Sequence, residues 1–299
     1  MTICSFLCAS CGCQGAEIPK EFAEERFYLM GNLSPSDSQM MGIVIQTKTK
    51  TIVIDGGTMS HANQLYEFLR EKANLHVDAW FFTHPHQDHI GAFYQLCNEF
   101  SVYDGLQVDN IYYNFPSIED IDEYGYRSAS EYRLQKATYE LLESKYTDRT
   151  HYIQKGQEIF FDGLKFTILR VYNQELKANF VNNSSAVFRI DSAEKSFLIL
   201  GDLGAEGGEE LMDTCSLSDL QTDYTQMSHH GQSGCSKEFY EYIHPKACIW
   251  PTPEWLWNNN SGVGFNTGSW QTVQTREWMQ KLGVTEHYVA KDGVQSIKL

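Results

Sequence analysis

The stretch Thr83-His84-Pro85-His86-Gln87-Asp88-His89-Ile90-Gly91 places four potential metal ligands within six residues. It directly follows the apolar run Val77-Asp-Ala-Trp-Phe-Phe82, which predicts a buried strand. A strand end is a stiff base, and the loop after it can turn alternate side chains toward two neighbouring points. We therefore expect His84 and His86 to serve one metal ion, and Asp88 and His89 to serve another.

The chemistry of these four side chains narrows the choice of metal. Imidazole and carboxylate ligands together suit Zn²⁺, with Mn²⁺ and Fe²⁺ as alternatives. Packing alone has no use for so many polar side chains at one strand exit. The expected cofactor is therefore a pair of divalent metal ions.

The sequence on either side of this stretch predicts a mixed α/β fold. Upstream, the expected elements are strands over 26–30, 42–46 and 51–55 and a helix from an N-cap at Ser60 to about Ala73. Downstream, one helix is expected to begin at the metal stretch and to carry Phe93, Leu96 and Phe100, and another is expected over 128–145. Two hairpins are expected after them, one of 158–162 with 165–170 and one of 186–190 with 196–200. Runs of strands with helices at the start of each half predict two sheets packed face to face, with helices outside.

The metal stretch, His84-x-His86-x-Asp88-His89-x-Gly91 after Thr83, resembles the signature of the metallo-β-lactamase superfamily. Three further segments resemble its later motifs in the same order: Thr51-Ile-Val-Ile-Asp55-Gly56-Gly57, Ser196-Phe-Leu-Ile-Leu-Gly201-Asp202 and Met227-Ser228-His229-His230-Gly231. The resemblance covers about residues 25–299. It implies the α/β fold of that superfamily, a four-layer αββα sandwich with the site at one edge.

The resemblance also implies roles for residues outside the first stretch. Asp55 would support the metal loop from behind, and Asp202 would bridge the two ions. Of the paired histidines, we expect His230 to bind the second ion, and His229 to hydrogen-bond a substrate oxygen or to protonate the leaving group. The candidate catalytic residues are Asp88, in the metal stretch, and His229.

The first ion is expected to keep an open coordination position. Many members place a third histidine between the first cluster and the bridging aspartate, but here the only histidine in that interval is His151, at the start of a strand-like run. We therefore leave His151 out of the site, and His84, His86 and Asp202 remain as protein ligands. Water or a substrate oxygen can occupy such an open position.

The segment Asn182-Asn183-Ser184-Ser185-Ala186-Val187 and the paired His-His-Gly resemble two subgroups, the hydrolase domain of late-competence DNA-uptake proteins and the phosphorylcholine esterases. The resemblance implies a dinuclear hydrolase that attacks its substrate with a metal-bridging hydroxide. The favoured substrate is a phosphodiester or other phosphoester, small or lipid-derived, that carries a choline-like group. Two alternatives stay open, an acyl hydrolase of the lactonase or thioesterase type and a non-catalytic metal-stabilised binding domain. Iron redox chemistry is disfavoured because His86 stands where di-iron members have a glutamate.

Charge and aromatic residues bear on the substrate. The 299 residues include 39 Asp and Glu against 23 Lys and Arg, a formal charge of −16, which opposes binding of a nucleic-acid backbone. Near Glu254, Trp255 and Trp257 are candidates for holding a quaternary ammonium group, because such groups bind aromatic faces. The alternative is that these rings pack in the core. No protein partner is predicted.

The first residues predict a separate segment. Residues 1–24 contain Cys4, Cys8, Cys11 and Cys13 after an apolar start, which resembles the end of a bacterial lipoprotein signal. The alternative is a frayed terminus, so a cytoplasmic and a lipid-anchored protein both stay open. No run of eighteen uncharged apolar residues predicts a membrane span.

Overall fold

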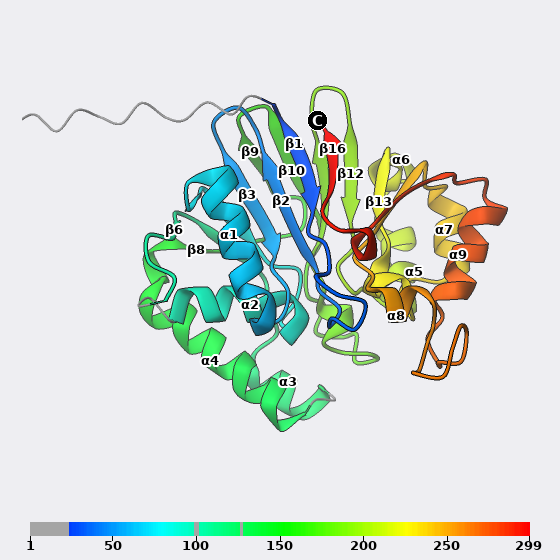
Figure 1. Cartoon of the computed structure of the whole chain (residues 1–299), viewed down its shortest axis with the longest axis horizontal. Coiled ribbons are helices and arrows are strands. Elements are labelled where there is room, and N and C mark those ends of the chain that lie inside the picture. The colour runs from blue at the N-terminus through cyan, green and yellow to red at the C-terminus, as the bar shows by residue number, and fades with distance from the viewer. Residues whose placement is uncertain (1–23, 99–101, 126–127) are drawn as a thin grey trace, which may run out of the picture.

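Two β-sheets lie face to face in the computed structural model, which describes residues 24–98, 102–125 and 128–299 (Figure 1). Helices cover the outer face of each sheet, so the order of layers is helix, sheet, sheet, helix. This confirms the predicted αββα sandwich. Apart from Glu24, the predicted leader lies outside the described residues, as does Phe100.

The first sheet holds the N-terminal half of the chain and the last strand. Its strands, in spatial order, are β16 (Gln295–Lys298), β1 (Arg26–Leu29), β2 (Gly42–Gln46), β3 (Thr51–Asp55), β5 (Ala79–Phe81), β7 (Ile111–Tyr113) and β8 (Thr150–Tyr152). Helices α1 (Ala62–Ala73), α2 (Gln87–Asn98), α3 (Ile118–Tyr124) and α4 (Ala129–Lys145) belong to this half. A two-stranded sheet of β4 (His76–Val77) and β6 (Gln107–Val108) lies beside it.

The second sheet holds the C-terminal half. Its strands, in spatial order, are β15 (Glu286–Val289), β14 (Ala247–Trp250), β13 (Tyr224–Gln226), β12 (Ser196–Ile199), β11 (Val187–Asp191), β10 (Leu164–Arg170) and β9 (Glu158–Phe161). Its helices are α5 (Ala205–Thr214), α6 (Leu217–Leu220), α7 (Lys237–Ile243), α8 (Glu254–Trp257) and α9 (Thr272–Lys281). Both predicted hairpins form, β9 with β10 and β11 with β12.

Alternation of side chains along the strands explains the layers. In β5, Phe81 points into the core between the sheets, where its ring stacks on Phe166 of β10 at 4.7 Å. Its neighbour Trp80 points to the other face and packs edge-on against Phe93 of α2. Successive side chains of a strand face opposite sides of a sheet, so one apolar run supplies two cores.

Phe81 supports a prediction about this core. Its replacement by alanine is expected to lower the free energy of unfolding by about 3–5 kcal/mol, because a cavity would open between rings that are completely buried. Urea denaturation followed by circular dichroism measures the change. Phe160, which is 66% exposed on the edge strand β9, is the matched control, and its alanine variant should change by under about 0.5 kcal/mol. Equal losses in both variants would contradict this account of the core.

The predicted N-cap at Ser60 is wrong. A 3₁₀ turn, Met59–His61, precedes α1, and Thr58 caps that turn. The reason is local, because the Thr58 N–H donates to Nδ1 of His61 at 3.1 Å, while the Ser60 hydroxyl bonds only to that of Thr58. The turn draws His61 into the interior and delays the start of α1 to Ala62.

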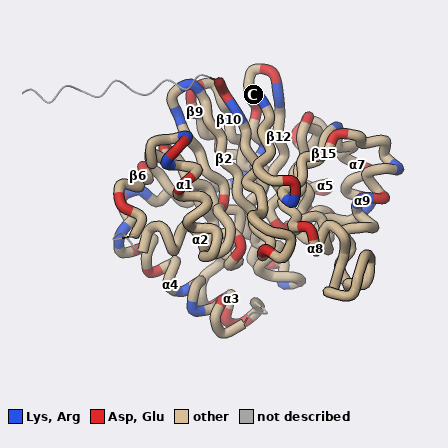
Figure 2. Tube along the Cα trace, viewed as in Figure 1, with Lys and Arg blue, Asp and Glu red and all other residues tan. Residues whose placement is uncertain are grey.

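Charged residues lie mainly on the outer helices and the loops, with acidic and basic positions interspersed in the view of Figure 2. The strands between them carry mostly other residues. Among the described residues, no helix has the length and apolar character needed to cross a membrane.

Candidate metal centre

The predicted motifs meet because the strands that carry them end at the same edge of the sandwich. In the first sheet, β3 and β5 run parallel, so Asp55 and the stretch after β5 come out together. In the second sheet, β12 and β13 also run parallel, so Asp202 and the paired histidines come out together. The carboxyl ends of parallel strands share one edge, which is a common place for ligand sites in α/β proteins.

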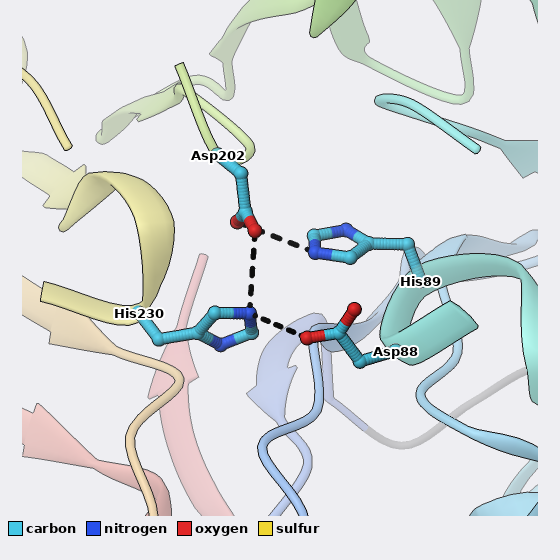
Figure 3. A group of neighbouring side chains, drawn as sticks. All are labelled: Asp88, His89, Asp202 and His230. Carbon is cyan, nitrogen blue, oxygen red and sulfur yellow. Dashed lines mark ion pairs between the residues drawn. The ribbon is translucent and has the colours of Figure 1, made fainter. Parts of the chain in front are cut away.

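Four buried side chains converge across the two sheets: Asp88, His89, Asp202 and His230 (Figure 3). His230 Nε2 lies 3.1 Å from Oδ2 of Asp88 and 3.5 Å from Oδ2 of Asp202. His89 Nε2 lies 3.3 Å from Oδ1 of Asp202. The ligand atoms therefore surround one common point, as a metal site requires.

A second group of ligand atoms shares one of these residues. His84, His86 and Asp202 bring one atom each within 4.8 Å of one another. Nε2 of His84 lies 3.8 Å from Oδ2 of Asp202 and 3.0 Å from Nδ1 of His86. His84 and His86 thus fall in one group and Asp88 and His89 in the other, and Asp202 belongs to both.

Asp55 stands behind both groups. Its Oδ2 accepts hydrogen bonds from Nδ1 of His89 at 2.8 Å and from the hydroxyl of Thr83 at 2.7 Å, and its Oδ1 accepts from the Thr83 N–H. The bond to Nδ1 leaves Nε2 of His89 facing the site. A carboxylate behind a histidine in this way fixes the ring and its tautomer. Asp55 belongs to neither ligand group.

The paired histidines point in different directions. His230 is completely buried and its Nδ1 donates to the carbonyl of Pro251 at 2.7 Å, which turns Nε2 toward Asp88 and Asp202. The side chain of His229 is 18% exposed, with Nε2 at 3.9 Å from Asp202 and Nδ1 at 3.2 Å from the carbonyl of Ser233. Both residues have positive φ, so the chain turns sharply after β13 and presents adjacent rings to separate places.

Burial and opposite charges set the protonation of the centre. Burial opposes the charged form of both Asp88 and Asp202, but nearby imidazoles outweigh it and hold both pKa values well below the usual range. Burial likewise opposes protonation of His230, yet Asp202 and Asp88 raise its pKa to about 10. Burial and the proximity of His89 lower the pKa of His84. Without a bound cation, protonated imidazoles thus supply the positive charge that stabilises the two carboxylates.

Divalent cations fit these residues. Among the described residues, His89 Nε2, His230 Nε2 and Asp202 Oδ1 are buried and lack a hydrogen-bond partner. Buried polar atoms are normally paired, so three such atoms around one point need an explanation. A metal ion satisfies all of them at once, and imidazole with carboxylate is a donor set that binds Zn²⁺ and similar ions.

A pocket of about 400 Å³ opens onto both groups. Its lining includes His86, Asp88, Asp202 and His229 from the centre and Trp255 at its rim. Trp255 is held there by a hydrogen bond from its Nε1 to the carbonyl of Asp37 at 2.8 Å.

Other candidate residues lie elsewhere. Trp257 does not line this pocket. It packs edge-on against Trp250 with Arg276 stacked on it, and its assignment to substrate binding stays a prediction. The two tryptophans flank one residue of the short helix α8 and therefore face different sides. His151 pairs with Asn110 and belongs to neither ligand group.

The structure adds polar residues that the sequence did not single out. Gln39 donates from Nε2 to Oδ2 of Asp88 at 2.9 Å, and Glu131 lines the pocket beside Gln87. No motif marks Gln39. Glu131 follows Ser128 by three residues, a pattern that indicates a helix cap, and its N–H does bond to the Ser128 hydroxyl. Its carboxylate faces the pocket instead, a position that only the tertiary structure reveals.

Comparison with known proteins gives a match to one family model over part of the chain, and several similar folds. Residues 41–147 match the model of the metallo-beta-lactamase superfamily. ComE operon protein 3 of Bacillus subtilis (strain 168) is 25% identical over 236 residues, which cover 74% of this chain and 27% of that protein. The chain thus spans about a quarter of the length of this curated relative.

Two solved structures share the fold. The metallo-beta-lactamase fold protein YhfI from Bacillus subtilis superposes with a TM-score of 0.55 at 14% identity, covering 92% of this chain and 100% of that one. CmlA, a diiron beta-hydroxylase from Streptomyces venezuelae, gives a TM-score of 0.52 at 10% identity, covering 92% of this chain and 54% of that one. At these identities the likeness concerns the fold alone, and it confirms the fold that was predicted.

Proposed function

We propose, from the match of residues 41–147 to the metallo-beta-lactamase superfamily, that the chain is a hydrolase that uses two divalent metal ions. One observation carries the proposal. Asp202 is completely enclosed between two separate groups of ligand atoms and belongs to both. A carboxylate shared in this way is the part of a two-metal site that sets the distance between the ions.

The proposed ligands are divided between the ions as the geometry divides them. His84, His86 and Asp202 would hold the first ion, and Asp88, His89, Asp202 and His230 would hold the second. We propose Zn²⁺, with Mn²⁺ and Fe²⁺ as the alternatives. Such a pair supplies a water that is activated near neutral pH and a Lewis acid that polarises the substrate.

The remaining residues position the reacting groups. Asp55 and Thr83 hold the ring of His89 from behind, and Gln39 holds the carboxylate of Asp88. His229 donates from Nδ1 to the Ser233 carbonyl, which leaves Nε2 open to the pocket. Burial lowers the pKa of His229, so its ring is neutral and Nε2 can accept a proton and pass it to the departing oxygen.

The pocket supports a phosphoester substrate with a cationic group. No Lys or Arg is among the described residues that line the pocket. Glu131 and the ring of Trp255 both line it. A carboxylate and an aromatic face attract a quaternary ammonium group. The phosphoryl oxygens would then face the ligand groups, and the cationic part, such as choline, would face Glu131 and Trp255. A nucleic acid is a poor fit to such a lining.

The test combines metal analysis with a substrate panel. Purified protein should contain two ions per chain and, with Zn²⁺ or Mn²⁺ supplied, should hydrolyse bis(p-nitrophenyl) phosphate and p-nitrophenylphosphorylcholine. His86→Ala should lower the rate on both. Wild-type rates in that variant would refute the metal mechanism. Turnover of lactones or thioesters with inert phosphodiesters would replace the phosphoesterase with an acyl hydrolase.

The rim of the pocket supports a prediction about selectivity. Trp255→Ala should raise KM for p-nitrophenylphosphorylcholine about 5- to 30-fold, since a desolvated cation–π contact contributes about 1–2 kcal/mol. It should leave KM for the bis-aryl substrate nearly unchanged. Trp257→Ala is the matched control, because it removes an equally half-buried ring of the same helix outside the pocket. Parallel changes with both substrates would argue against a cation site.

A further inference from the structure

Ser185 lies at the junction of the two halves of the metal centre. It follows the 3₁₀ turn η3 (Asn182–Ser184), which leads into β11, and it is completely buried. Its side-chain oxygen accepts the N–H of Asp202 at 3.0 Å. Asp202 is the residue that both ligand groups share, so a side chain from the segment before β11 fixes the backbone at that point.

The next residue makes the matching bond to the other sheet. The N–H of Ala186 donates to the carbonyl of Thr83 at 2.8 Å, immediately before His84. One dipeptide thus holds the backbone of Asp202 in the second sheet and that of Thr83 in the first. The spacing between the histidine stretch and the shared aspartate is set through these two bonds.

The local packing leaves little freedom at this junction. Gly201 has φ of +57°, and a Cβ placed on it would lie 2.8 Å from Oγ of Ser185 and 2.9 Å from Cβ of Thr83. A larger residue would push the Asp202 loop away from the histidine stretch. On the other side of Asp202, the N–H of Gly204 donates to Oδ1 of Asn183 at 2.8 Å. The segment from Asn183 to Ser185 therefore holds the loop at two points.

An ion pair between buried Arg170 and partly exposed Glu210 holds Ser185 itself. Arg170, at the end of β10, is 1% exposed and donates from Nη1 to the carbonyl of Ser185 at 2.9 Å. Its Nη2 and Nε donate to Oε2 of Glu210 on α5, at 2.9 and 3.2 Å. Glu210 compensates the buried guanidinium, which would otherwise be costly. The chain of contacts runs from Glu210 through Arg170 and Ser185 to Asp202.

We propose that Ser185 is the positioning residue that sets the shared ligand Asp202, and that the Arg170–Glu210 pair locks Ser185 in place. The inference rests on the proposed two-metal function, and it names residues that belong to neither ligand group. Removing the Ser185 hydroxyl leaves the buried N–H of Asp202 without its acceptor. The loop then moves to find another partner, and the carboxylate leaves the position that serves both ions.

The same turn offers a matched control. Ser184 is also completely buried, but its hydroxyl donates to the carbonyl of Val181 at 2.7 Å, away from Asp202. Ser185→Ala and Ser184→Ala remove the same atom from adjacent residues. Affinity for the two ions is measured by titration of chelator-treated protein with Zn²⁺, and ligand geometry by the visible absorption of the Co²⁺ form.

We expect Ser185→Ala to bind at least one ion about 10- to 100-fold more weakly and to shift the Co²⁺ bands, as loss of a residue supporting a ligand commonly does. Ser184→Ala should stay within about twofold of wild type with unchanged bands. Equal behaviour of the two variants would overturn the inference, while two ions in the wild-type protein would still support the proposed function. A wild-type protein without bound metal would overturn both.

Glu210→Gln keeps the test decisive if Ser185→Ala fails to fold. This side chain is partly exposed on α5 and keeps its shape, so the variant should fold while its hold on Arg170 weakens. Its Zn²⁺ affinity should fall about threefold or more, with shifted Co²⁺ bands. Wild-type affinity and bands in this variant would contradict the proposed lock.

Discussion

Asp202→Asn is expected to lose at least one of two bound metal ions and to lower the rate of phosphodiester hydrolysis about 10³-fold. The asparagine side chain keeps the shape of the aspartate but has no negative charge and only one oxygen acceptor. Both oxygens of Asp202 face imidazoles, Oδ1 toward His89 and Oδ2 toward His84 and His230. Loss of several kcal/mol of charge stabilisation in the transition state corresponds to a rate change of this size.

Metal content is measured by elemental analysis of the purified variant, and kcat with bis(p-nitrophenyl) phosphate. Asp78→Asn is the matched control, because Asp78 is also a buried carboxylate. It pairs with Lys50 and with the N–H of Thr51, and it lies in a separate group with His76 and Asp109, outside both ligand groups of the centre. That control should keep two ions and its rate, although its stability should fall. Two ions and an unchanged kcat in Asp202→Asn would remove the basis of the proposed function.

The sequence predicted the parts of the site that depend on strand ends. After a buried strand, the loop turns alternate side chains in two directions, and this depends on local geometry alone. His84 and His86 therefore separate from Asp88 and His89. The meeting of this stretch with Asp202 and His230 depends on parallel pairing in two sheets. That pairing joins strands that are distant in the sequence. The meeting of the motifs could therefore be predicted only through the family resemblance.

The pocket lining was less predictable because it is assembled from helices and loops that lie far apart in the sequence. Glu254 was expected to accompany the tryptophans, but it is exposed and does not line the pocket, whereas Glu131 of α4 does. In the sequence, Trp255 and Trp257 are two tryptophans of one short segment, and no feature of that segment distinguishes them. Only the direction of the short helix α8 decides which ring faces the centre. A single sequence carries no signal for that direction.

Removal of metal by a chelator is expected to abolish hydrolysis and to lower the melting temperature on the order of 10 °C. A metal ion whose free concentration is about 1,000 times its Kd stabilises the folded state by about 4 kcal/mol. Each kcal/mol moves the Tm of a chain of this size by about 2–4 °C. The chelated protein also keeps buried carboxylates at Asp88 and Asp202, beside the Nε2 atoms of His89 and His230, which lack a hydrogen-bond partner. Those groups lose their common partner when the ions leave.

Differential scanning calorimetry with and without EDTA, followed by addition of Zn²⁺ or Mn²⁺ in excess, measures both the loss and its reversal. Asp202→Asn separates the effect of bound ions from a general effect of the chelator. Because that variant starts with fewer ions, EDTA should lower its Tm by clearly less than in the wild type. An equal Tm with and without EDTA in wild-type protein that had been shown to contain metal would mean that the ions are not bound within the folded centre. The convergence of Asp88, His89, Asp202 and His230 would then need another explanation.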